Sequence, residues 1–193
     1  MKNELKEKYQ NEAVPKLKEQ FGLKNPNQVP ALEKVVLTTH IGHFVNDRKT
    51  AVEDAVEEIS KITGQKPSVV YARKSVANFK VREGEAVGAR VTLRGQRMWE
   101  FLDRFINITA PNVRDFRGFP FKSFDGRGNY AMGITDQAIF PEIELDQIKR
   151  QLGFDLIIVT STDDDKQAKA MLELLGFPFR KPAEKAEAAG AAA

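Results

Sequence analysis

The chain has 193 residues, of which 41% are hydrophobic and 30% are charged, a composition typical of a globular protein with a substantial core. The absence of cysteine excludes disulfides, thiolate zinc sites and cysteine nucleophiles, and it suits a reducing cytoplasm. No apolar run approaches the ~18 residues of a membrane span, and the polar start of the chain, MKNELKEKYQ, is unlike a secretory signal. We therefore expect a cytoplasmic protein that does not contact a membrane.

The first predicted helix covers residues 3–21, where apolar side chains recur at every fourth position. Pro15 interrupts it, so the helix either bends there or restarts with Pro15 in its first turn. Residues 33–41 then alternate between two sets of side chains and predict a strand. One face of this strand is formed by Val35, Leu37, Thr39 and Ile41, and the other by Lys34, Val36, Thr38 and His40.

The middle of the chain is predicted to form a helix, two strands and a second helix. The first helix has its apolar positions between residues 52 and 62, Asn46 or Asp47 is predicted to cap it, and Gly64 is well placed to end it. The strands cover residues 68–72 and 86–94, and the second of these has the clearest alternation in the chain. The second helix covers residues 96–108.

The C-terminal part is predicted to contain one strand and one helix. Residues 111–141 are rich in glycine and phenylalanine, so we expect them to be irregular. Residues 154–161 form a largely apolar strand, and Thr162 is predicted to cap a last helix that Gly176 closes. Residues 182–193 contain mostly alanine, glutamate and lysine and are predicted to be a disordered tail.

Strands and helices alternate, but their connections vary in length and the best strand is amphipathic. This pattern predicts a single α+β domain over residues 1–181, with a mainly antiparallel sheet. Helices would pack on one face of the sheet, and the second face would be polar and face RNA.

Positive charge is concentrated in one part of the chain, although the net charge is only +3. Glu83 and Glu85 are the acidic residues within this part. Such clustering is typical of a protein that binds a polyanion, most often nucleic acid, but it is also found on ordinary solvated surfaces. The cluster consists of Lys61, Lys66, Arg73, Lys74, Lys80, Arg82, Arg90, Arg94 and Arg97.

Two predicted strand faces carry polar side chains that could act together. If strands 33–41 and 86–94 share a sheet, their outward residues form one surface of hydrogen-bond donors. Such a surface can contact the phosphates and 2′-hydroxyl groups of folded RNA, or it can be an ordinary solvated sheet face. The outward residues of the second strand are Gly88, Arg90, Thr92 and Arg94.

Residues 73–85 are predicted to form a long loop that interleaves four cations with Phe79 and contains the flexible Gly84. A protruding basic loop can reach a phosphate backbone, and Phe79 could stack on a base or ribose. The alternative, which we favour for Phe79, is that it anchors the loop to the core together with Val76 and Val81.

Other chemical patterns are weak. His40 and His43 would lie on opposite faces of a strand without a third ligand, which argues against zinc. Residues 126–128, GRG, lack the rest of a phosphate-loop motif and are interpreted as a turn. Glu142, Glu144 and Asp146 are interpreted as surface charge.

Two rival classes of function remain. An enzyme acting on RNA or nucleotides would need a convergent acid–base or metal group, and the sequence offers none. A protein–protein adaptor could use the phenylalanine-rich residues 116–124 as an apolar patch.

Several long motifs, in order, resemble one family: bacterial large-subunit ribosomal protein five, a family of 5S-rRNA-binding ribosomal proteins. The similarity runs from about Leu5 to Lys181. The motifs are GQKP at 64–67, ARKSVANFKVREG at 72–84, VTLRGQRMWEFLDR at 91–104, RDFRGF at 114–119, KSFDGRGNYAMG at 122–133, IFPEI at 139–143 and GFPFRK at 176–181.

The resemblance implies a ribosomal protein without enzymatic activity or cofactor, which binds 5S rRNA in the central protuberance. Its implied rRNA-binding residues are Thr38, Gln65 and Thr92, with Lys34, Arg90 and Arg94 as phosphate contacts. The basic loop would reach P-site tRNA through Arg73, Lys74, Ser75, Lys80 and Arg82. Further implied partners are 23S rRNA, neighbouring 5S-binding ribosomal proteins, and a small-subunit head protein that forms an intersubunit bridge with residues 110–145.

The chain departs from the family pattern where the first strand ends. Thr38 stands where the family typically has asparagine, and it cannot copy the two-sided hydrogen bonding of an amide. His40 stands in place of a glycine. His40 and His43 are therefore candidates for RNA contacts of their own.

Overall fold

The computed structural model describes residues 3–42, 44, 47–113, 116–144, 146 and 148–180. The predicted tail over residues 182–193 and His43 lie outside the described residues. Within the described part of the chain, no helix combines the length and apolarity needed to cross a bilayer.

The N-terminal helical segment is continuous but changes its winding. It consists of α1 (Glu4–Lys8), a π-helical turn (Tyr9–Ala13) and α2 (Val14–Phe21). Pro15 lies in the first turn of α2, one of the two predicted alternatives, although the backbone stays helical from the π-helical turn into α2. Gly22 ends α2 in the left-handed conformation, with φ of 62°.

Five antiparallel strands form one sheet in the order β2-β3-β1-β5-β4. The predicted α+β class and antiparallel sheet are therefore confirmed. The central strand β1 pairs with β3 on one side and with β5 on the other, although β5 comes last along the chain. The strands are β1 (Leu32–His40), β2 (Ser68–Tyr71), β3 (Ala86–Leu93), β4 (Tyr130–Ile134) and β5 (Phe154–Thr160).

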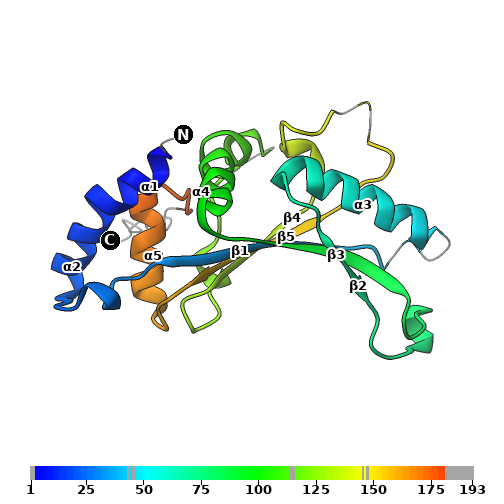
Figure 1. The fold of residues 1–193 in the computed structure, drawn as a ribbon, viewed down its shortest axis with the longest axis horizontal. Helices are drawn as coiled ribbons and strands as arrows, with labels where there is room; N and C mark the ends of the chain where they lie inside the picture. The colour runs from blue at the N-terminus through cyan, green and yellow to red at the C-terminus, as the bar shows by residue number, and fades with distance from the viewer. Residues whose placement is uncertain are drawn as a thin grey trace, which may run out of the picture.

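Helices α3 (Arg48–Thr63) and α4 (Gly95–Arg104) lie over one side of the sheet, as Figure 1 shows, and contact β3 and β1 respectively. Helix α5 (Asp165–Leu175) packs against the N-terminal helices at one end of the sheet. The core between these layers contains Val35, Leu37 and Val91, each at most 2% exposed. Thr39 is also fully buried, and its hydroxyl donates to the Gly153 carbonyl at 2.7 Å, so its polar group is satisfied.

Two predictions about the C-terminal part are wrong. Residues 111–141 were expected to be irregular, but they contain strand β4, whose residues Tyr130, Met132 and Ile134 are buried while Ala131 and Gly133 face outward. The cap of α5 is Asp164, whose carboxylate accepts from the Lys166 amide. The predicted cap, Thr162, lies three residues before the first residue of α5, and its hydroxyl instead accepts from the Asp164 amide.

Candidate nucleic-acid interface

The face of the sheet opposite α3 and α4, here called the open face, carries four of the predicted RNA-binding residues. They are Lys34 and Thr38 on β1 and Arg90 and Thr92 on β3. Thr38 lies directly opposite Arg90 in the β1–β3 register, and Val36 lies opposite Thr92. The strand pairing therefore brings the two predicted polar faces together, since cross-strand partners have Cβ atoms about 5 Å apart.

Gln65 reaches the same area from another element. It follows the left-handed Gly64 that ends α3, and its Nε2 donates to the Thr92 carbonyl at 3.3 Å. The other side of its amide accepts from Arg97 Nη1 at 3.4 Å. This hydrogen bond places Gln65 next to Thr92.

Arg94 lies just beyond β3 rather than within it, as the residue that caps α4. Its backbone is extended, and its side chain is exposed. Arg97, in the first turn of α4, was counted in the charge cluster but not predicted as a site residue. The available signal was its membership of the same cationic cluster, three residues after Arg94 in the sequence.

The open face is not uniformly cationic. Asp155 on β5 lies directly opposite Thr38, and its Oδ2 is 3.5 Å from His40 Nδ1. Both side chains are more than half exposed. Val36 and Ile157 are half-buried partners on the same face, so an apolar strip runs beside the charged residues. Arginine, hydroxyl, carboxylate and imidazole groups are thus brought together on a partly apolar surface.

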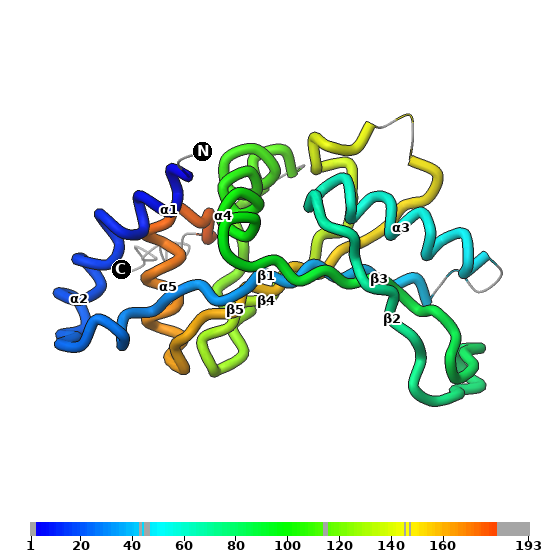
Figure 2. Tube along the Cα trace, viewed as in Figure 1, coloured from blue at the N-terminus to red at the C-terminus, as the bar shows by residue number. Residues whose placement is uncertain are grey.

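The β2–β3 loop, residues 72–85, projects away from the other elements at the lower right of Figures 1 and 2. Amide–carbonyl pairs between Val76 and Val81, at 2.9 and 3.2 Å, order its outer part. The Glu83 amide donates to the Ser75 hydroxyl at 2.9 Å. The residues predicted to contact tRNA are all exposed in this loop: Arg73, Lys74, Ser75, Lys80 and Arg82.

The prediction that Phe79 anchors the loop in the core is wrong. Its side chain is 71% exposed, and Val76 is 40% exposed. The reason is geometric: the short 3₁₀ turn Ala77–Phe79 lies at the tip of the hairpin that the Val76–Val81 pair closes, so the ring stays largely exposed instead of packing into the core. An exposed aromatic ring among cations remains available for stacking on a base.

The phenylalanine-rich residues 116–124 do not form an open apolar patch. Phe119 stacks near Phe105 and Phe177, with ring centroids 5.9 and 5.4 Å away. Phe121 and Phe124 contact Phe179 in the same way. These rings join the segment to the C-terminal end of the described chain, so their pattern reflects packing and gives no support to the adaptor alternative.

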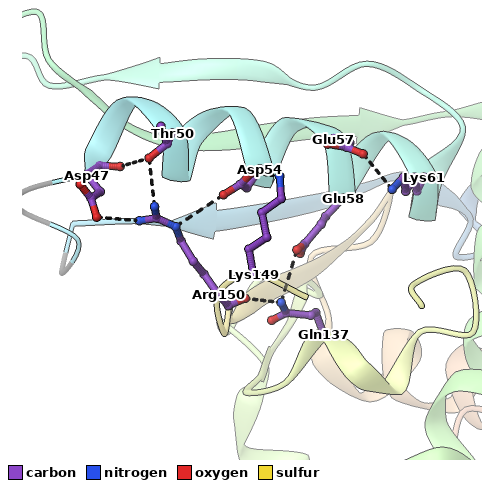
Figure 3. A network of polar contacts seen from close by, with 9 residues as sticks. All are labelled: Asp47, Thr50, Asp54, Glu57, Glu58, Lys61, Gln137, Lys149 and Arg150. Carbon is purple, nitrogen blue, oxygen red and sulfur yellow. Dashed lines mark hydrogen bonds and ion pairs between the residues drawn. The ribbon is translucent and has the colours of Figure 1, made fainter. Parts of the chain in front are cut away.

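The segment after β4 is fixed to α3 by the polar network in Figure 3. Arg150 approaches Asp54 at 3.5 Å and donates to the Thr50 hydroxyl at 3.0 Å, while Lys149 pairs with Asp54 at 3.1 Å. The Gln137 side chain is fully buried and donates to the Arg150 carbonyl. Within the part of the chain predicted to bridge the subunits, residues 110–145, it is Gln137 that contacts α3 in this network (Figure 3), because its Nε2 also donates to Glu58 Oε1 at 3.4 Å.

Glu58 in this network gives a pH-dependent prediction. Burial, and then the charge of Asp54, raise its pKa from 4.5 to about 7. The folded protein therefore binds a proton more tightly than the unfolded chain, so Glu58 lowers stability as pH rises from about 4.5 to about 7. Glu58→Gln removes this effect. Because Glu58 is only half-buried and solvent screens part of the interaction, the expected gain in the free energy of unfolding is roughly 1–2 kcal/mol at pH 8, with little change at pH 4.

Urea unfolding of both proteins at the two pH values measures this difference. Glu53→Gln, which changes an exposed carboxylate on the same helix, is the control. An equal gain at pH 4 and pH 8 would contradict the assignment to Glu58 ionisation.

Residues 126–128, GRG, form a turn. Arg127 and Asn129 amides both donate to Asp125 Oδ1, which closes a turn as predicted. A Cβ on Gly128 would lie 2.1 Å from the Thr162 carbonyl oxygen, so this glycine permits a close backbone contact. Among the described residues, no cluster of acidic or histidine side chains could hold a metal ion.

Comparison with known proteins decides the family. A model of the ribosomal L5P family C-terminus matches residues 86–179, and the ribosomal protein L5 model matches residues 25–82. The chain belongs to the ribosomal protein L5 family. The two matched regions meet at the β2–β3 loop, and both supply strands to the single sheet.

Bacterial relatives are similar over nearly their whole length, and each is called large ribosomal subunit protein uL5. The Rubrobacter xylanophilus protein is 54% identical, over 91% of this chain and 97% of the relative. The Thermoanaerobacter protein is 53% identical, over 92% and 98%. The protein of Streptococcus pneumoniae strain Hungary19A-6 is 50% identical, over 94% and 100%.

Membership of the L5 family confirms the resemblance seen in the motifs. The chain is a structural, non-enzymatic constituent of the large subunit of the bacterial cytoplasmic ribosome. Its partners are accordingly rRNA and other ribosomal proteins.

Proposed function

We propose that this protein binds 5S rRNA in the central protuberance through its open face and the adjoining start of α4. The observation that supports this most strongly is the Arg90–Thr38 pair, which sets a guanidinium beside a hydroxyl on an accessible sheet surface. Lys34, Arg90 and Arg94 would contact phosphates, while Thr38, Gln65 and Thr92 would fix the register on the RNA. The Gln65 contact with Arg97 extends the same cationic surface to the first turn of α4.

The β2–β3 loop is proposed to contact P-site tRNA. Four cations and the exposed ring of Phe79 on one protruding hairpin suit a single-stranded or looped RNA segment, whose bases can stack on an aromatic side chain. The open face and the loop would then bind different RNAs, 5S rRNA and tRNA.

The remaining proposed contacts concern the body of the ribosome. Residues 110–145 would bridge to a small-subunit head protein, and the hydrogen bond from Gln137 in this region to Glu58 on α3 (Figure 3) supports a firm contact. We also propose contacts with 23S rRNA and with neighbouring 5S-binding ribosomal proteins. Residues 1–181 would act as one domain, since β1 lies between strands from both later parts of the chain.

A gel-shift titration of 5S rRNA, with an unrelated RNA of equal length as the control, tests the 5S rRNA proposal. With about six phosphate contacts, the affinity is expected to fall roughly a thousandfold between ~50 and ~200 mM salt, because each contact releases a counterion. Specific binding should persist at salt concentrations that abolish binding of the control RNA. A flat salt dependence, or equal affinity for both RNAs, would reject the proposed interface.

A further inference from the structure

A buried arginine connects the start of α3 to the β2–β3 loop. The Arg48 side chain is only 5% exposed. Its Nη2 donates to the Phe79 carbonyl at 3.2 Å, and its Nη1 lies 2.5 Å from the Glu85 carboxylate. One side chain therefore contacts both the outer turn of the loop and the residue at its base.

Glu85, one of the two acceptors of Arg48, also makes hydrogen bonds within the base of the loop. The carboxylate oxygen of Glu85 that pairs with Arg48 also accepts from the Arg82 amide at 2.9 Å. The backbone carbonyl of Glu85 accepts from the Ala72 amide at 2.8 Å. Glu85 thus joins both sides of the loop base, and Arg48 holds Glu85 against the helix.

The contact with Phe79 acts at the outer turn. The Phe79 carbonyl belongs to the peptide before Lys80, which has a left-handed backbone with φ of 51° and ψ of 37°. A residue with a Cβ adopts this conformation at a cost, so it persists only where neighbouring contacts favour it. A charged hydrogen bond to the adjacent carbonyl is such a contact, because it fixes the orientation of the peptide that the turn requires.

We infer that Arg48 is the positioning residue of the β2–β3 loop: it holds the loop in the conformation that presents Phe79 and the loop cations to an RNA partner. That the partner is tRNA rests on the proposed function; the positioning itself does not. The same contacts keep the turn residues 78–81 beside the end of β1, where they and His40, Gly42 and Val87 line a groove of about 470 Å³. A flat base beside the Phe79 ring is the kind of group that this groove suits.

The competing explanation is that Arg48 simply stabilises the fold. Buried ion pairs are poor contributors to stability, because desolvation of the two charges offsets most of their attraction. Removing one partner is costly only where the other charge stays buried, and the Glu85 side chain is 36% exposed, so water can solvate its carboxylate when Arg48 is replaced by methionine. The Arg48→Met change should therefore loosen the loop more than it destabilises the sheet. This difference separates a positioning role from a general structural one.

Hydrogen exchange of the free protein tests the inference, with Arg48→Met compared against Lys49→Met, which removes an exposed cation at the next position of α3. Arg48→Met is expected to speed exchange of the Val76, Val81 and Arg82 amides about tenfold or more, the effect of losing a hydrogen bond to a charged group. Amides of the β1–β3 ladder should keep their rates, and Lys49→Met should change neither set. Unchanged loop rates, or equal acceleration in loop and ladder, would overturn the inference.

A second pair of variants guards against misfolding. Arg48→Met combined with Glu85→Met removes both charges, so no unpaired carboxylate remains near the helix. The double variant should stay as stable as the parent while its loop amides still exchange faster. Arg48→Lys, which keeps the charge but cannot contact both acceptors with a planar fork, should give an intermediate rate. If the loop amides of the double variant exchanged at the rates of the parent protein, the inference would also be overturned.

The ribosomal arm separates this inference from the proposed tRNA contact. P-site tRNA binding is compared between two kinds of ribosome. One contains this protein with Arg48→Met, and the other contains it with alanine in place of Arg73, Lys74, Lys80 and Arg82. Weaker P-site tRNA binding in both, at unchanged 5S rRNA affinity, supports the inference. The factor by which tRNA affinity falls in the Arg48→Met ribosomes should not exceed the factor by which the population of the ordered loop falls. If tRNA binding is weaker in the alanine variant alone, Arg48 does not serve this contact. If it is weaker in neither variant, the tRNA proposal is rejected, and the exchange data still decide whether Arg48 positions the loop.

Discussion

Reversing Arg90 and Arg94 to glutamate is expected to abolish specific 5S rRNA binding while leaving the protein folded. Each arginine lost to a phosphate removes a charged hydrogen bond worth about 1.5–3 kcal/mol, so the pair should weaken binding at least a hundredfold even before repulsion is counted. The two glutamates add repulsion of the phosphates, one on the open face, where Asp155 already lies opposite Thr38, and one at the start of α4. Gel shifts at low salt measure the loss.

The fold should tolerate this reversal because both side chains are exposed. Circular dichroism and urea unfolding should show a change within about 0.5 kcal/mol, as for surface substitutions in general. Lys16→Glu combined with Lys24→Glu makes the same change in net charge at exposed positions near the two ends of α2, and it serves as the control. Unchanged RNA affinity in the Arg90 and Arg94 variant, or an equal loss in the control, would show that the open face is not the binding surface.

Replacing the buried Gln137 by leucine is expected to destabilise the protein strongly. The amide of this side chain accepts from the Leu152 amide and donates to the Arg150 carbonyl, so one residue satisfies two backbone groups of the connection that leads to β5. Leucine has a similar volume but no polar atoms, which leaves both groups buried without partners. At about 1–3 kcal/mol for each unsatisfied group, the free energy of unfolding should fall by roughly 2–5 kcal/mol.

Urea unfolding measures this loss, and Gln151→Leu, an exposed glutamine in the same connection, is the matched control. The control should change stability by no more than about 0.5 kcal/mol. A loss below about 1 kcal/mol in the Gln137 variant would mean that the Arg150 carbonyl and the Leu152 amide find other partners.

The strands that carry the open face could be predicted because their side chains alternate. Residues 33–41 and 86–94 show a period of two with different chemistry on each side, and the structure places these strands at Leu32–His40 and Ala86–Leu93. Strand β4 escaped prediction because its outward positions are Ala131 and Gly133, which give no polar signal between the buried residues. Small residues next to several glycines look like a loop when only the sequence is considered.

The long-range contacts of the site could not be predicted from local patterns. Gln65 was assigned through family resemblance, but its hydrogen bond to the Thr92 carbonyl depends on how α3 ends against β3. Arg48 gave no signal at all, since an arginine at a helix start is commonly solvated, and only the fold buries it against Glu85. Phe79 was misplaced for a related reason: a lone aromatic in a basic loop is compatible with either burial or exposure, and the 3₁₀ turn decides between them.

The position of β1 at the centre of the sheet has a consequence for how each new molecule matures. One edge of this strand pairs with β3, but the other must wait for β5, whose last residue is Thr160. At a synthesis rate of roughly 5–20 residues per second, that edge stays unsatisfied for on the order of ten seconds after β1 itself has been made. Late pairing of distant segments is slow and leaves apolar surface exposed to aggregation. Until β5 is made, the unfinished sheet therefore presents an unpaired strand edge and apolar surface of the kind that chaperones bind.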